Sequence, residues 1–156
     1  MPDSYREVSE PTLGALFDYW AARCRGRRMP SRRDIDPLEL PRKHLPDLML
    51  IEVFHDPVRF RYRLVGTRVV AASGEDRTGK FFHEVPFFKN HSLVLEQFKQ
   101  VAVTGRPLYS LEPFRNYIEN TTYQVDRLLL PLSSDGASVD MLMVGFHFKT
   151  GPYAAP

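Results

Sequence analysis

A chain of 156 residues with 43% hydrophobic content is expected to form one globular domain with a substantial core. Its 21 basic and 19 acidic residues leave a net charge of +2, so charge alone does not direct it to nucleic acid or an acidic membrane. The start is polar and no run of about 18 apolar residues occurs, which predicts neither a secretory signal nor a membrane span. The single cysteine, Cys24, rules out an internal disulfide and fits a reducing compartment, so we expect a cytoplasmic protein.

The first predicted element is a helix over about residues 10–25. Its apolar side chains recur at helical spacing and form one stripe, made of Leu13, Leu16, Phe17, Trp20, Ala21 and Cys24. Ser9 is the expected N-cap, Pro11 suits the first turn, and Gly26 suits the C-terminal end. Because this helix precedes the strand-forming region, its stripe is expected to pack on the sheet or on a partner chain.

A basic segment follows the helix. Within residues 23–33 there is no acidic residue and there are six arginines, namely Arg23, Arg25, Arg27, Arg28, Arg32 and Arg33. Such a run suits phosphates or an acidic partner, or it is a solvated helix end whose charge complements the helix dipole. No aromatic side chain is interleaved with it, and Asp34 and Asp36 follow, so nucleic-acid binding is the less favoured interpretation. Asp36 and Pro37 then predict a short capped helix.

Residues 48–65 predict a hairpin of two strands. Leu48–Phe54 is a nearly continuous apolar run, and Arg59–Val65 alternates arginines with Phe60, Tyr62 and Leu64. This period-two pattern is typical of a strand with one buried and one solvated face. The residues 55–57, His-Asp-Pro, predict the turn between the two strands.

The second half of the chain predicts a helix and three strands. After short helical pieces over residues 66–85, a long helix is expected over residues 88–104, with Gly105 as its stop. Strands are expected over residues 108–114, 122–132 and 139–149, the last two joined by a hairpin loop at residues 133–136. No crossover helix separates these strands, which predicts an antiparallel sheet in an α+β domain.

Five motifs resemble, in order, those of a family of single-domain bacterial PAS proteins. They are Phe17-Asp18-Tyr19-Trp20, Asp34-Ile35-Asp36-Pro37, Arg61–Thr67, Glu75–Lys80 and Leu130–Ser133. The resemblance covers roughly residues 12–148 and implies a PAS-like five-stranded antiparallel sheet with helices on one face, a ligand cavity between them and an extra N-terminal amphipathic helix. It implies three segments: a helix, basic linker and short helix over residues 1–47 that pack on the core, the PAS core over residues 48–150, and a tail over residues 151–156.

The resemblance also implies where a ligand would lie. The side chains that we expect at the cavity are Phe81, Phe82, His91, Leu95, Phe98, Tyr109, Tyr123, Met141 and Met143. Light-sensing flavin chemistry would need a cysteine in the helical middle of the domain, whereas Cys24 lies on the leading helix. A haem would need a histidine such as His91 or His83, but a solvated histidine is the plainer interpretation. A ligand pocket and a plain packed core both stay open.

Metal and enzymatic sites have weaker support. The five histidines are scattered and a single cysteine gives no thiolate cluster, so no metal site is expected. The best enzymatic alternative is a small isomerase- or hydrolase-like protein with a cavity in a curved sheet, where Asp126 would pair with Tyr109, Tyr117 or Tyr123 for proton transfer. More simply, Asp126-Arg127 is a charged position at a strand edge, and we expect no catalytic activity.

The favoured function is a cytoplasmic sensory or regulatory PAS module that binds a small ligand, a protein partner or both. The chain leaves no room for an output domain beside the sheet, so a signal is expected to leave through a protein contact. The predicted assembly is a homodimer through the leading helix, with Leu13, Leu16, Phe17 and Trp20 at the interface. A phosphate or nucleic-acid binder using the Arg23–Arg33 run is the remaining alternative.

Overall fold

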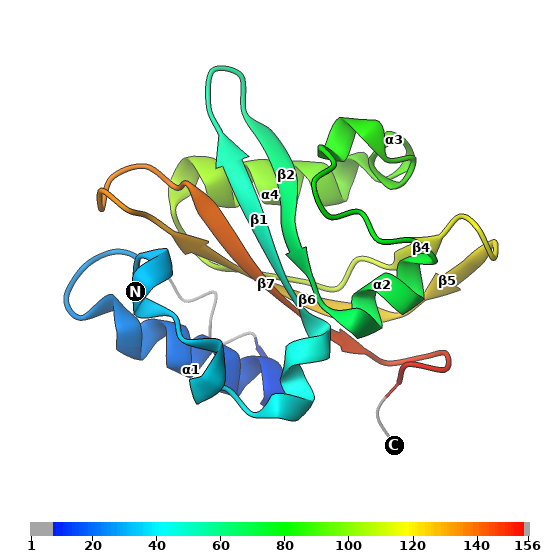
Figure 1. The fold of residues 1–156 in the computed structure, drawn as a ribbon, viewed down its shortest axis with the longest axis horizontal. Coiled ribbons are helices and arrows are strands. Elements are labelled where there is room, and N and C mark those ends of the chain that lie inside the picture. The colour runs from blue at the N-terminus through cyan, green and yellow to red at the C-terminus, as the bar shows by residue number, and fades with distance from the viewer. Residues whose placement is uncertain (1–7, 155–156) are drawn as a thin grey trace.

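A five-stranded antiparallel sheet of order β2-β1-β7-β6-β3 forms the centre of the protein in a computed structural model, which describes residues 8–154 (Figure 1). Its strands are β1 (Leu48–Phe54), β2 (Arg59–Val65), β3 (Leu108–Ser110), β6 (Val125–Leu132) and β7 (Met141–Phe148). The predicted α+β class, the PAS-like sheet and the first hairpin are confirmed. Residues 1–7 of the predicted N-terminal segment and residues 155–156 of the predicted tail lie outside the described residues.

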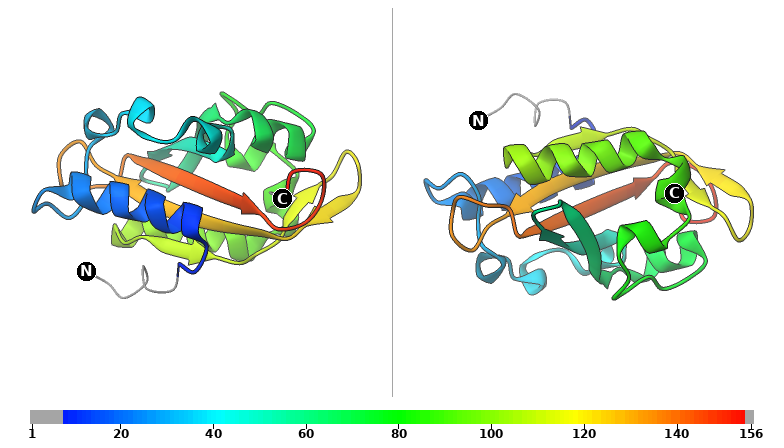
Figure 2. Two further views of the ribbon diagram at one scale, coloured as in Figure 1. Left: turned by 90° about the horizontal axis from the view of Figure 1, so that it is seen from below. Right: turned by 90° about the horizontal axis from the view of Figure 1, so that it is seen from above.

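Helices cover both faces of this sheet (Figure 2). The face that we call inner carries α2 (Thr67–Ser73), α3 (Phe87–Asn90) and α4 (Ser92–Thr104). The opposite, outer face carries α1 (Pro11–Cys24), which packs on β6 and β7. Between these elements lie the 3-10 helices η2 (Arg32–Asp34), η3 (Pro37–Glu39), η4 (Arg42–Asp47) and η5 (Phe82–Glu84), and a hairpin of β4 (Phe114–Asn116) and β5 (Thr121–Tyr123).

The strand β6 is buried along its whole length because both faces are covered. Arg127 pairs with Phe146 of β7, and Leu129 pairs with Val144; these residues face the inner side. Alternate residues of β6, such as Leu128, face α1 on the outer side, because successive strand side chains point to opposite faces. A single strand therefore contributes side chains to both layers.

The amphipathic helix α1 rests on the outer face of the sheet. Its N-cap is Glu10, whose carboxylate accepts a hydrogen bond from the Leu13 amide at 2.8 Å, and not Ser9 as predicted. The Trp20 indole donates to the carbonyl of Pro131 on β6 at 2.9 Å. Gly145 of β7 permits this close approach, since a Cβ there would lie 2.5 Å from a methyl carbon of Leu16.

Several predicted boundaries are wrong for local reasons. The helix expected over residues 88–104 is broken at His91, whose φ of −129° and ψ of 58° separate α3 from α4. The strand expected over residues 108–114 ends at Ser110, and the strand over residues 122–132 divides because β5 leaves the main sheet to pair with β4. Asp36 caps the short helix as predicted, although that helix is 3-10, and Gly105 ends α4 with a φ of 67°.

Among residues 8–154, no helix combines the length and the apolar character needed to cross a membrane.

Candidate functional site

A small cavity lies between the inner face of the sheet and the helices that cover it. Its walls include Tyr62 of β2, Arg127 of β6, Phe98 of α4 and the loop residue Arg77. The cavity has a volume of about 20 Å³, which is room for roughly one water molecule. In this structure the inner layer is therefore closely packed, and polar groups lie within an aromatic core.

Phenylalanine rings occupy most of the inner layer. Phe82 and Phe88 stack with their centroids 4.1 Å apart and 7° between their planes. Phe98 meets Phe82 edge-on at 5.1 Å, and Phe60 stacks on Phe82 at 5.2 Å. These are the offset and edge-on arrangements that ring quadrupoles favour. Of the predicted cavity residues, Phe98 lines the cavity and Phe82 supports its wall.

Arg127 brings a positive charge into this aromatic layer. Arg127 is only 2% exposed. Its guanidinium donates hydrogen bonds to the Glu112 carbonyl at 2.7 Å and to the Pro113 carbonyl at 3.2 Å. Its guanidinium carbon lies over three aromatic rings, 5.8 Å from that of Phe87, 5.9 Å from that of Phe114 and 5.6 Å from that of Phe146. Burial lowers the pKa of Arg127 to about 10, which still leaves the group charged at neutral pH.

Tyr62 and Arg77 complete the polar part of the cavity wall. Burial raises the pKa of Tyr62 to about 12, against the opposite effect of the nearby Arg77 and Arg127 charges. Arg77 is also buried, and its Nε lies 3.3 Å from a carboxylate oxygen of Glu75. The cavity therefore has two cationic groups and a neutral hydroxyl among aromatic rings.

Three predicted cavity residues lie on the outer side of the sheet instead. Met143 pairs with Leu130 and shares the face of Gly145, against which α1 packs, and Met141 follows the same alternation. The Tyr109 hydroxyl donates to the buried carboxylate of Asp126, which also faces outward. This corrects the expectation that they face the cavity: residues two apart in a strand share a face, and these have the parity of the outer one.

The remaining candidates lie around the rim of the inner layer. Leu95 lines a surface groove outside the cavity, and Phe81 packs on Phe54 at 5.7 Å. His91 stacks on Phe87 at 4.2 Å, with its Nδ1 2.9 Å from the Phe87 carbonyl oxygen. Tyr123 packs edge-on against Phe148 near the chain end.

The carboxylate–tyrosine pair considered for proton transfer is only partly assembled. Tyr109 contacts Asp126, but Tyr117 contacts His91 and Tyr123 contacts Glu119. Lys149 places its ammonium 2.9 Å from the Asp126 carboxylate. Asp126 and Arg127 are both buried in an interior strand, so the expectation of a charged position at a strand edge was wrong. The pair belongs to the outer packing layer and not to the cavity.

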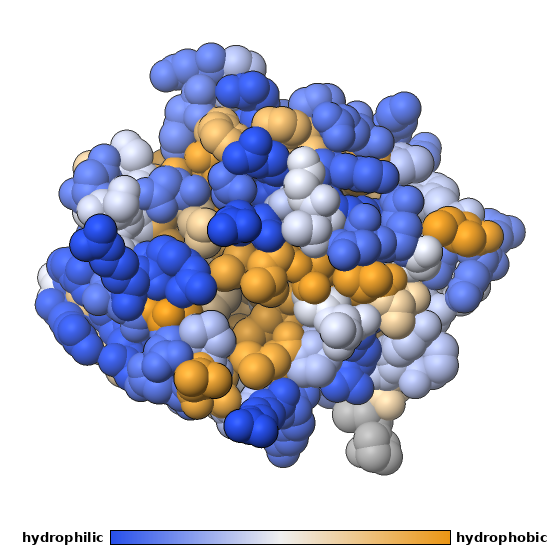
Figure 3. All heavy atoms as spheres, in the orientation of Figure 1, coloured by the Kyte–Doolittle hydropathy of each residue, from blue (hydrophilic) through white to orange (hydrophobic). Residues whose placement is uncertain are grey.

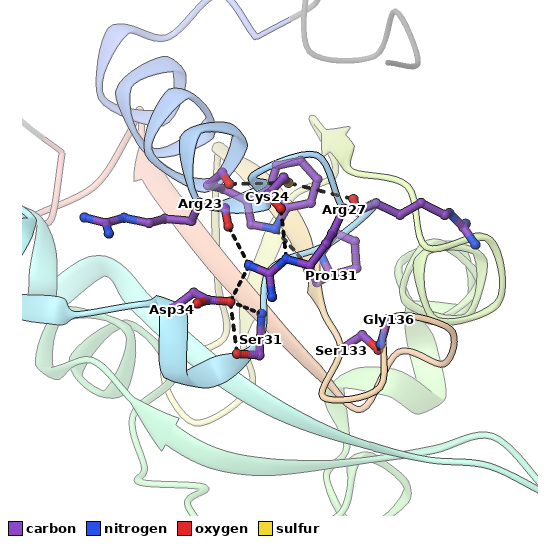
Figure 4. Close-up of polar contacts among 10 residues, drawn as sticks. Arg23, Cys24, Arg27, Ser31, Asp34, Pro131, Ser133 and Gly136 are labelled. Carbon is purple, nitrogen blue, oxygen red and sulfur yellow. Dashed lines mark hydrogen bonds and ion pairs between the residues drawn. The ribbon is translucent and has the colours of Figure 1, made fainter.

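Several arginines of the run contact other parts of the chain, and Figure 4 shows the contacts of Arg27. Arg27 donates to the Asp34 carboxylate at 2.7 Å, and Arg23 pairs with the Glu39 carboxylate. Arg28 donates to the Thr104 carbonyl at the C-terminal end of α4. Contacts of this kind support the interpretation of the run as a solvated helix end that joins α1 to its neighbours.

A second depression lies on the outer side, between α1 and the 3-10 helices η3 and η4. It has a volume of about 140 Å³ and mainly apolar walls that include Leu16, Leu40 and Leu48. Figure 3 shows apolar residues gathered at the centre of the face seen in Figure 1, with hydrophilic residues around them.

The residues present do not fit the larger PAS cofactors that the sequence raised. A cavity of about 20 Å³ does not accommodate a flavin or haem ring system without extensive rearrangement. Cys24 lies on α1, on the far side of the sheet from the cavity, and burial raises the pKa of its thiol. Among residues 8–154, no group of three or more histidine, cysteine, aspartate or glutamate side chains has the arrangement of a metal site.

Sequence reasoning missed the polar residues of the cavity. Arg127 lies in a strand where its neighbours are nearly all apolar, and a charged residue in such a run is a signal for a buried charge. Arg77 lies in a loop and carries no comparable signal. The sequence predicts Phe88 at the start of a long helix, but it lies in α3, which the break at His91 separates from α4, and its ring stacks on Phe82.

Comparisons with known proteins agree with this geometry. A family model described as a PAS domain matches residues 8–146. No curated protein sequence matches the chain. The Rhodobacter sphaeroides LOV protein has a TM-score of 0.53 at 12% identity, over 65% of this chain and 57% of that one. A fungal LOV domain photoreceptor has a TM-score of 0.50 at 14% identity, over 94% of this chain and 97% of that one.

At these identities the two solved structures establish the fold alone, and the chain spans little more than half the length of the Rhodobacter protein.

Proposed function

This chain belongs to the PAS domain family, and on that basis we propose that it is a cytoplasmic sensory or regulatory module without catalytic activity. A small ligand bound at the inner face would change how α1 packs on the outer face, and a protein partner would read that change. The observation that carries the proposal is that β6 and β7 take part in both layers, with α1 on one side and the aromatic cavity on the other.

The path from cavity to helix is short. Arg127 faces the cavity, and the adjacent Leu128 faces the side of the sheet on which α1 lies. Further along the same strand, the Pro131 carbonyl accepts the hydrogen bond of Trp20. A shift of β6 that accommodates a ligand would therefore move the surface on which α1 rests, because close-packed layers transmit displacement.

A ligand acts in this scheme only through a difference in affinity. If α1 has two packings on the sheet, a ligand that binds both equally shifts neither. Coupling energies between protein sites are typically equivalent to changes of about 5- to 150-fold in an equilibrium constant. A change at the cavity should therefore alter the opening equilibrium of α1 by at least about fivefold.

The test perturbs the cavity and measures α1. In the Phe98→Leu variant, amide hydrogen exchange of residues 11–24 should be at least about fivefold faster than in the wild type. Emission from Trp20, the sole tryptophan, should shift in parallel because the ring is buried against β6. Val103→Ala is the matched control, since Val103 lies exposed on the same helix as Phe98.

Two results contradict the proposal. One is exchange in α1 that is unchanged by Phe98→Leu while exchange in the strands beside the cavity accelerates. The other is an acceleration that is uniform over the chain, which would report a loss of global stability and no specific coupling.

The proposal also includes a protein partner for α1, namely a second copy of this chain. A homodimer through Leu13, Leu16, Phe17 and Trp20 stays a prediction, and these residues are all buried on the chain's own sheet. Such a dimer therefore requires exchange of α1 between two copies, which is a known route to dimers. Light scattering across a concentration series tests it: a dimer that disappears on Trp20→Ala supports exchange, and a monomer at every concentration contradicts it.

A further inference from the structure

The cavity on the inner face has an unbalanced charge. Arg127 and Arg77 both line it and both are buried. Among residues 8–154, Arg127 has no ion pair, and Arg77 has one, with the partly exposed Glu75. Carbonyl groups and aromatic rings offset part of the cost of burying a guanidinium, but a buried charge is ordinarily paired.

A basic groove lies outside the cavity. It has a volume of about 340 Å³, and its walls carry Arg59, His83, Lys89 and Lys99 around the apolar surface of Phe60 and Leu95. No acidic residue lines this groove, so its charge favours the approach of anions.

Phe88 separates the groove from the cavity, because it is the residue that lines both. It belongs to α3, a helix of four residues that ends at the break at His91. Its ring lies parallel to that of Phe82 at 4.1 Å. A rotation of Phe88 into the groove would leave a flat, apolar space against Phe82, next to the cavity that the two arginines line.

From this arrangement we propose that the cavity binds a planar aromatic carboxylate. The aromatic ring takes the position of the Phe88 ring against Phe82, and the carboxylate pairs with Arg127, assisted by Arg77. Phe88 and Arg127 line the same cavity, and the Phe87 ring lies beside both, 4.9 Å from the Phe88 ring and 5.8 Å from the Arg127 guanidinium carbon, which brings the proposed carboxylate close to the guanidinium. The inference rests on the proposed sensory function and adds the chemical class of its ligand.

The chemistry favours a carboxylate on a flat ring over other small ligands. A guanidinium presents parallel N–H groups that match the two oxygens of a carboxylate. A neutral ring would fill the space but leave the charge unpaired, and a free inorganic anion would leave the space beside Phe82 empty.

Benzoate is the probe, measured by isothermal titration calorimetry and ligand-observed NMR. Opening the path with Phe88→Ala should strengthen benzoate binding at least about tenfold relative to the wild type. In the Phe88→Ala background, Arg127→Met should weaken it at least about tenfold, the usual scale for a charge-assisted hydrogen bond. Arg63→Met is the matched control, because Arg63 is exposed on the same sheet, and it should leave binding unchanged.

A series of ligands tests the role of the carboxylate without relying on any arginine variant. In the Phe88→Ala protein, benzyl alcohol and benzamide have the ring without the charge and should bind at least about tenfold more weakly than benzoate. Acetate has the charge without the ring and should also bind more weakly. Equal affinity for benzoate and benzamide, or unchanged affinity on Arg127→Met, would overturn the proposal.

The same titration separates the two proposals. Benzoate that binds with the expected selectivity but leaves Trp20 emission and α1 exchange unchanged supports the ligand class and contradicts the sensory coupling. If α1 responds to Phe98→Leu but benzoate does not bind Phe88→Ala, the coupling stands and the ligand class is wrong.

Discussion

The outer face of the sheet packs on one long helix, α1, whereas the inner face packs on the long helix α4 and the shorter α2 and α3, with aromatic rings and two buried arginines in its layer. The helix α1 has fourteen residues and a continuous buried stripe, and α3 has four residues and ends at a backbone break. On the proposed function this contrast predicts different roles for the layers: α1 anchors the outer layer, and the inner layer has the buried charges, the two short helices and the polar groups of the cavity.

The largest effect should come from removing the main anchor of the outer layer. Trp20→Ala deletes a buried ring and its hydrogen bond to Pro131, and it should lower the free energy of unfolding by about 3–5 kcal/mol. Urea denaturation followed by far-UV circular dichroism measures this, with the exposed Asp18→Ala on the same helix as control. A loss below about 1 kcal/mol would show that α1 does not stabilise the domain.

A smaller effect on stability is expected from substituting Gly66, which lies between β2 and α2. In Gly66→Ala, the new Cβ would lie 2.3 Å from the Pro46 carbonyl oxygen, although the φ of −62° suits alanine. We expect destabilisation of about 1–3 kcal/mol, since η4 must shift. Gly14→Ala is the contrasting control: it lies within α1 with nothing within 4 Å, and it should be neutral or stabilising by up to about 1 kcal/mol. Equal melting temperatures for the two variants would show that a Cβ at residue 66 does not clash with Pro46.

The inner layer should tolerate the loss of its charge. Arg127→Met removes two hydrogen bonds to carbonyl oxygens but also the cost of burying a guanidinium, so stability should change by no more than about 1 kcal/mol in either direction. The measurement is the same urea titration. A loss comparable to that of Trp20→Ala would erase the contrast between the layers and make Arg127 a structural residue.

The smallest effect concerns the thiol of α1. Burial raises the pKa of Cys24, so less thiolate is present at pH 8 than for a free cysteine, and reaction with a disulfide reagent should be slow. We expect it to be at least about tenfold slower than in the urea-unfolded chain. Reaction at the unfolded rate would mean that α1 leaves the sheet freely and that the outer layer is the mobile one.

The sequence predicts the sheet well where one face is solvated. The alternation of Phe60 and Tyr62 with arginines identifies β2 and its buried side. Leu64, the third apolar residue of that alternation, is 49% exposed instead, because the β1–β2 register shifts between Tyr62 and Leu64. In β6, apolar residues occupy both faces, so no period-two pattern assigns Leu128 or Arg127 to a side. Only the pairing with β7 and the position of α1 decide between the faces.

The cavity was less predictable than the fold because it depends on breaks and loops. Neither proline nor glycine lies within residues 87–95, so only the weak helix-end signals of Asn90 and Ser92 mark the change of backbone direction at His91. The short helix α3 before that break carries Phe88, which stacks on Phe82, and the loop containing Arg77 brings a second charge to the cavity. Such contacts arise between elements far apart in the chain and leave little trace in local periodicity.

Gly145 offers a way to vary the distance between α1 and the sheet in small steps. The spacing between α1 and β7 is set at this position by a hydrogen atom, where any larger substituent meets the methyl groups of Leu16 and Leu13. Replacing Gly145 with alanine, serine or valine would place a progressively larger side chain there, and each would hold α1 farther from the sheet. On the proposed function, a graded series of variants with different resting positions of α1 could thus be made at one residue, without altering the inner layer.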